Sequence, residues 1–232
     1  MRQSKQSHSS LMSNGMASTS PQPNQSLQPT PKAKSALGSL RCAPAQAELK
    51  RLERMKTRTI SSVEEVDSLL DNIQTAAITA LGHIEGAATE GPISALWKMK
   101  FEPLGCDPID GTSRLNLIEQ LNQSFTYAAT ALAIRRLFSL HPGRGSFRIN
   151  LGTAAGYDIE SEDPTFLAAE VFAAVTPSNN QKLKKDLLKL AESSALHRYV
   201  FFMAPGFEAG RQERLETQPG IQVWTLGGQN AL

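Results

Sequence analysis

Residues 147–175, with the sequence FRINLGTAAGYDIESEDPTFLAAEVFAAV, contain the pattern that decides the fold class. Phe147, Ile149 and Leu151 alternate with the polar residues between them. This two-residue period is typical of a strand that buries one face. Glycine and other small residues fill positions 152–156, so the strand should end in a turn there.

Two further strands should follow within the same stretch. Residues 157–161 form the second expected strand, and Asp163 and Pro164 begin the next turn. Residues 166–175 are apolar except for Glu170, which predicts a third strand buried on both faces. Because the connections are short, the three strands should form an antiparallel meander.

The meander is flanked by segments with helical and strand patterns. A helix is expected before it at 115–140, and after it a helix at 180–193, a strand at 197–204, a short helix at 207–216 and a last strand at 221–226. The chain therefore predicts an α/β (α+β) fold, with a small mixed sheet of about five strands flanked by helices. If strands three and four are parallel, their crossover should be right-handed.

The chain divides into three expected parts. Residues 1–43 are rich in Ser, Gln and Pro and offer too little apolar surface to offset the entropy of ordering, so we expect a disordered tail. Residues 44–100 should form a helical extension, and residues 101–232 the α/β domain.

One long amphipathic helix is expected inside the extension. Ser61 and Ser62 precede two glutamates, a typical helix start, and apolar residues then recur at intervals of three and four. A helix over 61–84 must bury its apolar stripe against the main domain or against a second copy. A homodimer through residues 61–84 is therefore one expectation.

The composition of the chain indicates where the protein is located. No run of 18 or more apolar residues occurs, so we expect no membrane span. The two cysteines, Cys42 and Cys106, form no disulfide framework, and the N-terminus lacks the apolar region of a secretory signal. These features favour a cytoplasmic location, with an organellar address as the minor alternative.

Charge is distributed unevenly along the chain. Five of the 24 basic residues and none of the 22 acidic residues lie in residues 1–47, so the remainder carries a net negative charge. If the folded part binds nucleic acid, it must use a local basic patch, with or without the tail.

Two carboxylates should meet on neighbouring strands. Glu170 lies in a strand that is otherwise apolar, where an ionised carboxylate is costly unless it is paired or binds a cation. With the turn at 162–165, antiparallel pairing brings Asp158 close to Ala169 or Glu170. Two converging carboxylates are ligands that suit Mg²⁺ or Mn²⁺.

The order helix, strand, strand, strand, helix, strand, together with Asp158 and Glu170 twelve residues apart, resembles the PD-(D/E)xK nuclease superfamily over residues 112–226. The resemblance implies a restriction-endonuclease-like fold and a metal-dependent nuclease. It also implies that Asp158 and Glu170 hold the metal and that an acid on the first helix, here Glu119, joins them.

The family's lysine, two positions after the second acid, is missing because position 172 is Phe. Some members place this lysine on the following helix, and Lys182 is the candidate here. Lys182, Lys184, Lys185 and Lys189 make this helix basic, so it could contact the phosphates of a nucleic acid.

Each of these residues also has a purely structural interpretation. Glu170 could form a buried ion pair with Arg148 or Arg198. Asp158 and Glu119 could be solvated acids, and the lysine-rich helix a solvated face. The domain would then be an inactive nuclease-like fold that serves as a nucleic-acid or protein interaction module.

Residues 107–112, Asp-Pro-Ile-Asp-Gly-Thr, resemble the metal-binding motif of inositol-monophosphatase-like enzymes. That family has an apolar strand directly before the motif and a later Trp-Asp pair, whereas neither Trp97 nor Trp224 is followed by Asp. We therefore interpret 107–112 as a loop before the long helix, and a phosphatase remains a minor alternative.

Overall fold

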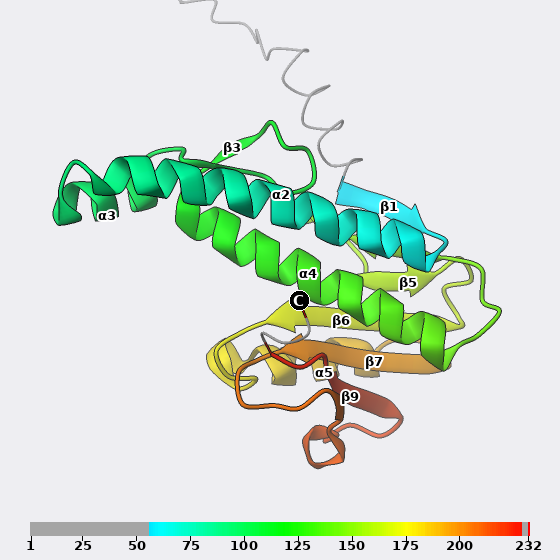
Figure 1. Cartoon of the computed structure of the whole chain (residues 1–232). Coiled ribbons are helices and arrows are strands. Elements are labelled where there is room, and N and C mark those ends of the chain that lie inside the picture. The colour runs from blue at the N-terminus through cyan, green and yellow to red at the C-terminus, as the bar shows by residue number, and fades with distance from the viewer. Residues whose placement is uncertain (1–55, 229–231) are drawn as a thin grey trace, which may run out of the picture. The chain divides into compact units, whose positions relative to one another are not determined.

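A seven-stranded mixed β-sheet forms the centre of the computed structural model, which describes residues 56–228 and residue 232 (Figure 1). The strands lie in the order β1 (Thr57–Ile60), β4 (Phe147–Asn150), β5 (Ile159–Ser161), β6 (Leu167–Ala173), β7 (His197–Met203), β9 (Ile221–Thr225) and β8 (Gly210–Arg211). The tail predicted for residues 1–43 lies outside the described residues.

The predicted meander is confirmed. Strands β4, β5 and β6 pair antiparallel, whereas β6, β7 and β9 are parallel neighbours. Helix α5 (Lys182–Ala191), entered through the short 3₁₀ turn η1 (Asn179–Gln181), makes the crossover from β6 to β7. The mixed sheet flanked by helices is thus correct as an α/β (α+β) arrangement.

The expected number of strands, about five, is too low. The edge strand β1 pairs with β4. Strand β1 lies inside residues 44–100, the segment that we expected to be a helical extension. At the other edge, β8 pairs with β9. Strand β8 lies within residues 207–216, where we expected a short helix and only the 3₁₀ turn η2 (Glu213–Leu215) forms. Both additional strands are short and lack the apolar alternation that identifies a strand in a sequence.

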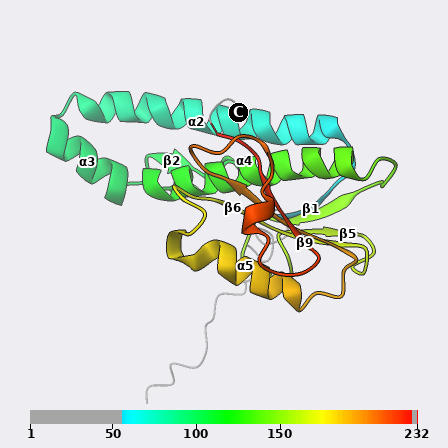
Figure 2. The ribbon, with the colours of Figure 1, turned by 90° about the horizontal axis from the view of Figure 1, so that it is seen from below.

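Helices cover both faces of the sheet. Helix α4 (Leu117–Leu140) lies on one face with α2 (Val63–Ala88) packed over it, and α5 lies on the opposite face (Figure 2). The remaining elements are α3 (Pro92–Phe101) and a two-stranded ribbon of β2 (Gly105–Cys106) and β3 (Arg114–Leu115). No helix within the described residues is long and apolar enough to cross a bilayer.

The long helix predicted from its cap begins where expected. The Ser62 hydroxyl accepts a hydrogen bond from the Glu65 N–H at 3.3 Å, and the Glu65 carboxylate accepts one from the Ser61 N–H at 2.7 Å. Ser62 is thus the N-cap of the helix, and Glu65 reaches back to the residue before the cap, an arrangement that resembles a capping box. The helix continues to Ala88, beyond the expected end near residue 84, and buries Val66 and Leu69 in the core that contains α4.

Strand β6 separates two apolar cores. Its residues Leu167, Ala169 and Val171 join the core beneath α4, whereas Ala168 and Phe172 join the core beneath α5. Side chains alternate along a strand, so Glu170 shares the α5 face with Phe172. The only charged residue of this strand therefore points toward the lysine-rich helix.

Candidate functional site

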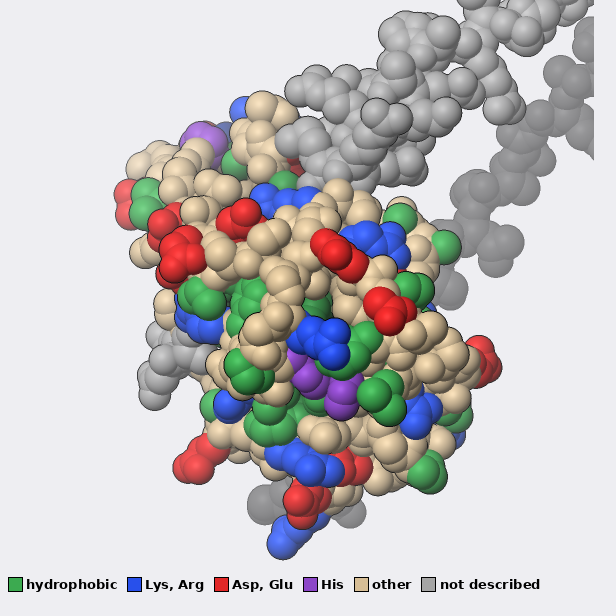
Figure 3. Space-filling model, turned by 90° about the vertical axis from the view of Figure 1, so that its right-hand side faces the viewer, with side chains coloured by type: hydrophobic (Ala, Val, Ile, Leu, Met, Phe, Trp, Pro, Cys, Tyr) green, Lys and Arg blue, Asp and Glu red, His purple; other side chains and the backbone are tan. Residues whose placement is uncertain are grey.

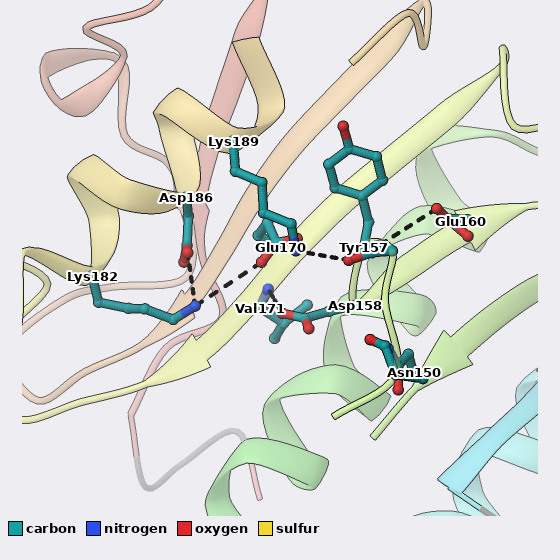
Figure 4. A network of polar contacts seen from close by, with 11 residues as sticks. Asn150, Tyr157, Asp158, Glu160, Glu170, Val171, Lys182, Asp186 and Lys189 are labelled. Atoms are coloured by element: carbon teal, nitrogen blue, oxygen red, sulfur yellow. Dashed lines mark hydrogen bonds and ion pairs between the residues drawn. The ribbon is translucent and has the colours of Figure 1, made fainter. Parts of the chain in front are cut away.

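The register between β5 and β6 brings two carboxylates together. Ile159 pairs with Ala169 and Glu160 with Ala168, so the next positions outward are Asp158 and Glu170. The Asp158 Oδ2 atom accepts a hydrogen bond from the Val171 N–H at 2.8 Å. The expected proximity of Asp158 and Glu170 is therefore present, and Figure 4 shows the two side chains beside the lysines of α5.

Glu170 is paired with lysines. Its side chain is 3% exposed, and its Oε1 atom lies 2.5 Å from the Lys189 ammonium. The Lys182 ammonium lies 4.0 Å from Oε2. Lys189 also donates a hydrogen bond to the Gly156 carbonyl at 2.7 Å, so it joins α5 to the loop between β4 and β5.

Sequence reasoning missed a third carboxylate, Asp186. It is 3% exposed, and its Oδ1 atom accepts a hydrogen bond from Lys182 at 2.7 Å. Its Oδ2 atom is buried and has no hydrogen-bond partner within the described part of the chain. The available signal was helical spacing, since Asp186 lies three residues after Leu183 and four before Leu190, on the apolar side of α5.

The three acids hold their protons more tightly than usual. Burial, reinforced by the charge of Asp158, raises the pKa of Glu170 to about 7, although Lys189 opposes the shift. Burial likewise raises the pKa of Asp158, against the hydrogen bond from Val171 and the nearby lysine charges. Burial also raises the pKa of Asp186, with Lys182 opposing it. Such shifts in a cleft are typical of functional sites.

The same three acids stabilise the charged form of Lys182. Burial acts to lower the pKa of its ammonium, but the hydrogen bond to Asp186 and the charges of Asp186, Asp158 and Glu170 outweigh burial and raise that pKa. Lys182 is therefore held in its charged form inside the cluster.

A cavity of about 570 Å³ opens beside Asp158, at the end of the sheet where β6 finishes. Its polar lining comes from α4, from the end of β4, from the residue before β5, and from η1 and α5: Asn122, Thr126, Thr130, Asn150, Asp158, Asn179, Asn180, Lys182 and Lys185. A space of this size, with amide, hydroxyl, carboxylate and ammonium groups, is suited to a polar or anionic ligand.

The structure brings some of the predicted residues together and leaves others apart. Lys185 lines the cavity, whereas Lys184 is an exposed residue of α5. Glu119 is exposed in the first turn of α4, where its N–H donates to the Asn116 side chain. Glu119 is not among the residues that line the cavity.

The alternative interpretation, in which Glu170 pairs with Arg148 or Arg198, is wrong as to the partner, because Glu170 pairs with lysines. Arg148 pairs with Glu160, and Arg198 donates to the carbonyls of Leu190 and Pro219. Arg148 lies opposite Glu160 in the pairing of β4 with β5, and Arg198 lies at the start of β7 beside the end of α5.

Phe172 has a structural role that explains the missing lysine. Its side chain is 4% exposed and stacks on Phe202 with ring centroids 5.8 Å apart. A lysine at 172 would place an ammonium in the apolar core beneath α5. In this chain the ammonium groups near Glu170 come from Lys182 and Lys189 instead.

The aspartates of residues 107–112 stabilise a loop. Asp107 accepts from the Ile109 N–H and forms an ion pair with Lys56 at 2.9 Å. Asp110 accepts from the backbone N–H groups of Thr112 and Ser113. The carboxylate oxygens thus fix the turn before β3, in agreement with the interpretation of this segment as a loop.

The donor set of the acidic cluster suits a hard cation. Carboxylate oxygens are the ligands that Mg²⁺ and Mn²⁺ prefer, and the buried Asp186 Oδ2 atom still has an acceptor site. Among the described residues no three His, Cys, Asp or Glu side chains are grouped to hold a metal ion by themselves. Mg²⁺ commonly binds through one or two carboxylates and completes its shell with water and substrate phosphates.

A second polar cluster lies at the opposite end of β6 and β7. Figure 3 shows the face of the molecule at this end, where two histidine side chains lie together near the middle, among hydrophobic and basic groups. They are His141 and His197, with ring centroids 4.6 Å apart. The His141 Nε2 atom is hydrogen-bonded to the Tyr199 hydroxyl at 2.9 Å, and burial lowers the pKa of His141.

No protein-family model, no curated protein and no solved structure matches this chain. A functional assignment therefore depends on the residues of the site and their geometry.

Proposed function

We propose that this protein is a metal-dependent phosphodiesterase that acts on nucleic acid, built on a restriction-endonuclease-like core of the PD-(D/E)xK type. The observation that carries the proposal is the position of Asp158 directly beside Glu170, under two lysines and at the rim of a polar cavity. The element order α4, β4, β5, β6, α5, β7 supports the same core.

Asp158 and Glu170 are the residues that would hold Mg²⁺ or Mn²⁺. Such an ion lowers the pKa of a bound water, which supplies a nucleophile near neutral pH. Asp158 is held in place by the Val171 N–H, and Glu170 by its strand and the lysines. The protein thus offers a preformed pair of carboxylates, an arrangement that avoids ordering them when the ion binds.

Lys182 is the residue best placed to stabilise charge on a phosphate. It lines the cavity, and its side chain retains 41% exposure although its ammonium contacts Asp186. Lys185 extends the positive charge along the same wall. Lysines in such positions bind nucleic-acid phosphates without reading sequence, so the substrate should be recognised through its backbone.

A second function is favoured by Phe172. Because the core fills the usual lysine position with an aromatic ring, the domain could bind nucleic acid or protein without catalysis. The two functions differ in what metal does, since a binding module needs no ion to retain its ligand.

A cleavage assay separates the two functions. The full chain is incubated with single-stranded and duplex oligonucleotides in Mg²⁺ or Mn²⁺, beside Asp158→Asn, Glu170→Gln and the control Glu162→Gln, which changes an exposed acid. We expect cleavage by the wild type and the control, abolished by EDTA and reduced at least about 100-fold in the other two variants. If the wild type binds the oligonucleotides without metal, and neither it nor any variant cleaves them, the result would favour the interaction module.

A further inference from the structure

Lys189 occupies the position around Glu170 that a cation would take. Its ammonium lies 2.5 Å from Glu170 Oε1 and 2.7 Å from the Gly156 carbonyl oxygen. One carboxylate oxygen and one backbone carbonyl oxygen are typical ligands of a hard divalent ion. The protein therefore supplies its own positive charge at this point.

Two ammonium groups, those of Lys182 and Lys189, lie among the buried acids. Asp158 lies beside Glu170 on the neighbouring strand, and Asp186 lies on α5 with the two lysines. Lys182 is shared between Asp186 and Glu170, whereas Lys189 pairs with Glu170 alone among the acids. Of the two lysines, Lys189 is thus the one whose removal leaves Asp186 paired.

The Lys189 side chain can also move away from Glu170. Its side chain is 46% exposed, whereas that of Glu170 is 3% exposed, so the flexible lysine can turn into solvent while the acid stays fixed. Long lysine side chains change rotamer readily at a surface.

We propose that Lys189 is a resident counter-ion of Glu170, which a divalent cation must displace from the carboxylate in order to bind. The proposal rests on the proposed function, because it concerns the same metal-binding acids. It assigns Lys189 a role in setting metal affinity, distinct from the general phosphate contact expected from its helix.

Metal affinity measured without any substrate tests the proposal. Mn²⁺ is titrated into the full chain by calorimetry, beside Lys189→Met, Lys189→Arg and Lys184→Met. The Lys184 variant removes the same charge from the same helix at an exposed position that lines neither the cavity nor the acid cluster. Circular dichroism checks that each variant is folded.

We expect Lys189→Met to bind Mn²⁺ about tenfold more tightly than the wild type, because one competing positive charge is gone from the carboxylate. Lys189→Arg should not gain affinity, since the guanidinium keeps the charge, and Lys184→Met should stay within about twofold of the wild type.

Chemical labelling gives a second readout that does not depend on the variants. An amine-reactive reagent with mass spectrometry should modify Lys189 of the wild type more in Mn²⁺ than in its absence, with Lys184 unchanged. Equal or weaker Mn²⁺ binding by Lys189→Met than by the wild type overturns the counter-ion role and leaves the proposed function intact. Absence of Mn²⁺ binding in the wild type and in every variant overturns the metal site itself.

Discussion

The Asp158 carboxylate accepts a hydrogen bond from the backbone N–H of Val171, 2.8 Å away, and so lies fixed against the strand that carries Glu170. The bond crosses from the start of β5 to β6, one residue past Glu170. It satisfies one oxygen of Asp158 with a donor that cannot move away. The two acids therefore stay close to one another, and their burial raises the pKa of both, with the charge of Asp158 adding to the shift of Glu170.

Glu170 should make stability depend on pH. The folded state raises its pKa from about 4.5 to about 7, so the fold binds a proton that the unfolded chain has already released. This contribution is fully present below about pH 4.5 and is lost as pH rises through about 7. Urea unfolding of Glu170→Gln and wild type measures this effect at pH 5 and pH 8. The unfolding free energy of the variant minus that of the wild type should be about 2 to 3 kcal/mol larger at pH 8 than at pH 5. A difference independent of pH would contradict this account.

His141 should destabilise the fold in acid. Burial, with His197 and Arg144, lowers its pKa below the ordinary 6.5, so the unfolded chain takes up the proton first. Stability from this residue is present above pH 6.5 and is lost as pH falls below it. We expect His141→Gln to flatten the loss of unfolding free energy between pH 7.5 and pH 5.5, measured by urea denaturation. Identical slopes in variant and wild type would show that His141 is not responsible.

Phe172→Lys should fail to restore a family-like lysine. The ring is buried beneath α5 against Phe202, so the substitution removes packing and buries an ammonium. We expect a loss of at least about 3 kcal/mol in unfolding free energy, against about 1 kcal/mol for Phe172→Leu. Thermal denaturation followed by circular dichroism measures both. A stable Phe172→Lys protein would mean that this position can open toward the acids.

A homodimer through residues 61–84 remains a prediction that sedimentation can check. Val66, Leu69 and Ile73 of α2 are buried within the chain, but Ile78 and Leu81 are 64% and 58% exposed. We expect the wild type to sediment as a dimer and the double variant Ile78→Glu/Leu81→Glu as a monomer. Thr79→Glu adds a charge at an exposed polar position of the same helix and should remain dimeric. A monomeric wild type would exclude this interface.

The central part of the fold could be predicted because its signals are local. Alternation at Phe147 and Ile149 and the apolar run around Glu170 identify strands, and the short turn between β5 and β6 fixes their register to within one residue. That register places Asp158 beside Glu170 without knowledge of the rest of the chain.

The contacts around those acids could not be predicted, because they depend on tertiary placement. The periodicity of α5 shows that Lys182 and Lys189 share a face, but not which carboxylate each ammonium meets. Asp186 was overlooked among four lysines, although its position on the apolar side distinguishes it. Strand β1 exists through its pairing with β4, which no feature of residues 57–60 alone indicates.

Calorimetric titration of Mn²⁺ into the full chain, beside Asp158→Asn, Glu170→Gln and Glu162→Gln, tests whether Asp158 and Glu170 hold the metal. We expect binding by the wild type and by Glu162→Gln, with affinity reduced at least about tenfold in each of the other two variants, because each removes a charged ligand. Unchanged affinity in Asp158→Asn and Glu170→Gln would place the metal elsewhere and contradict the proposed site.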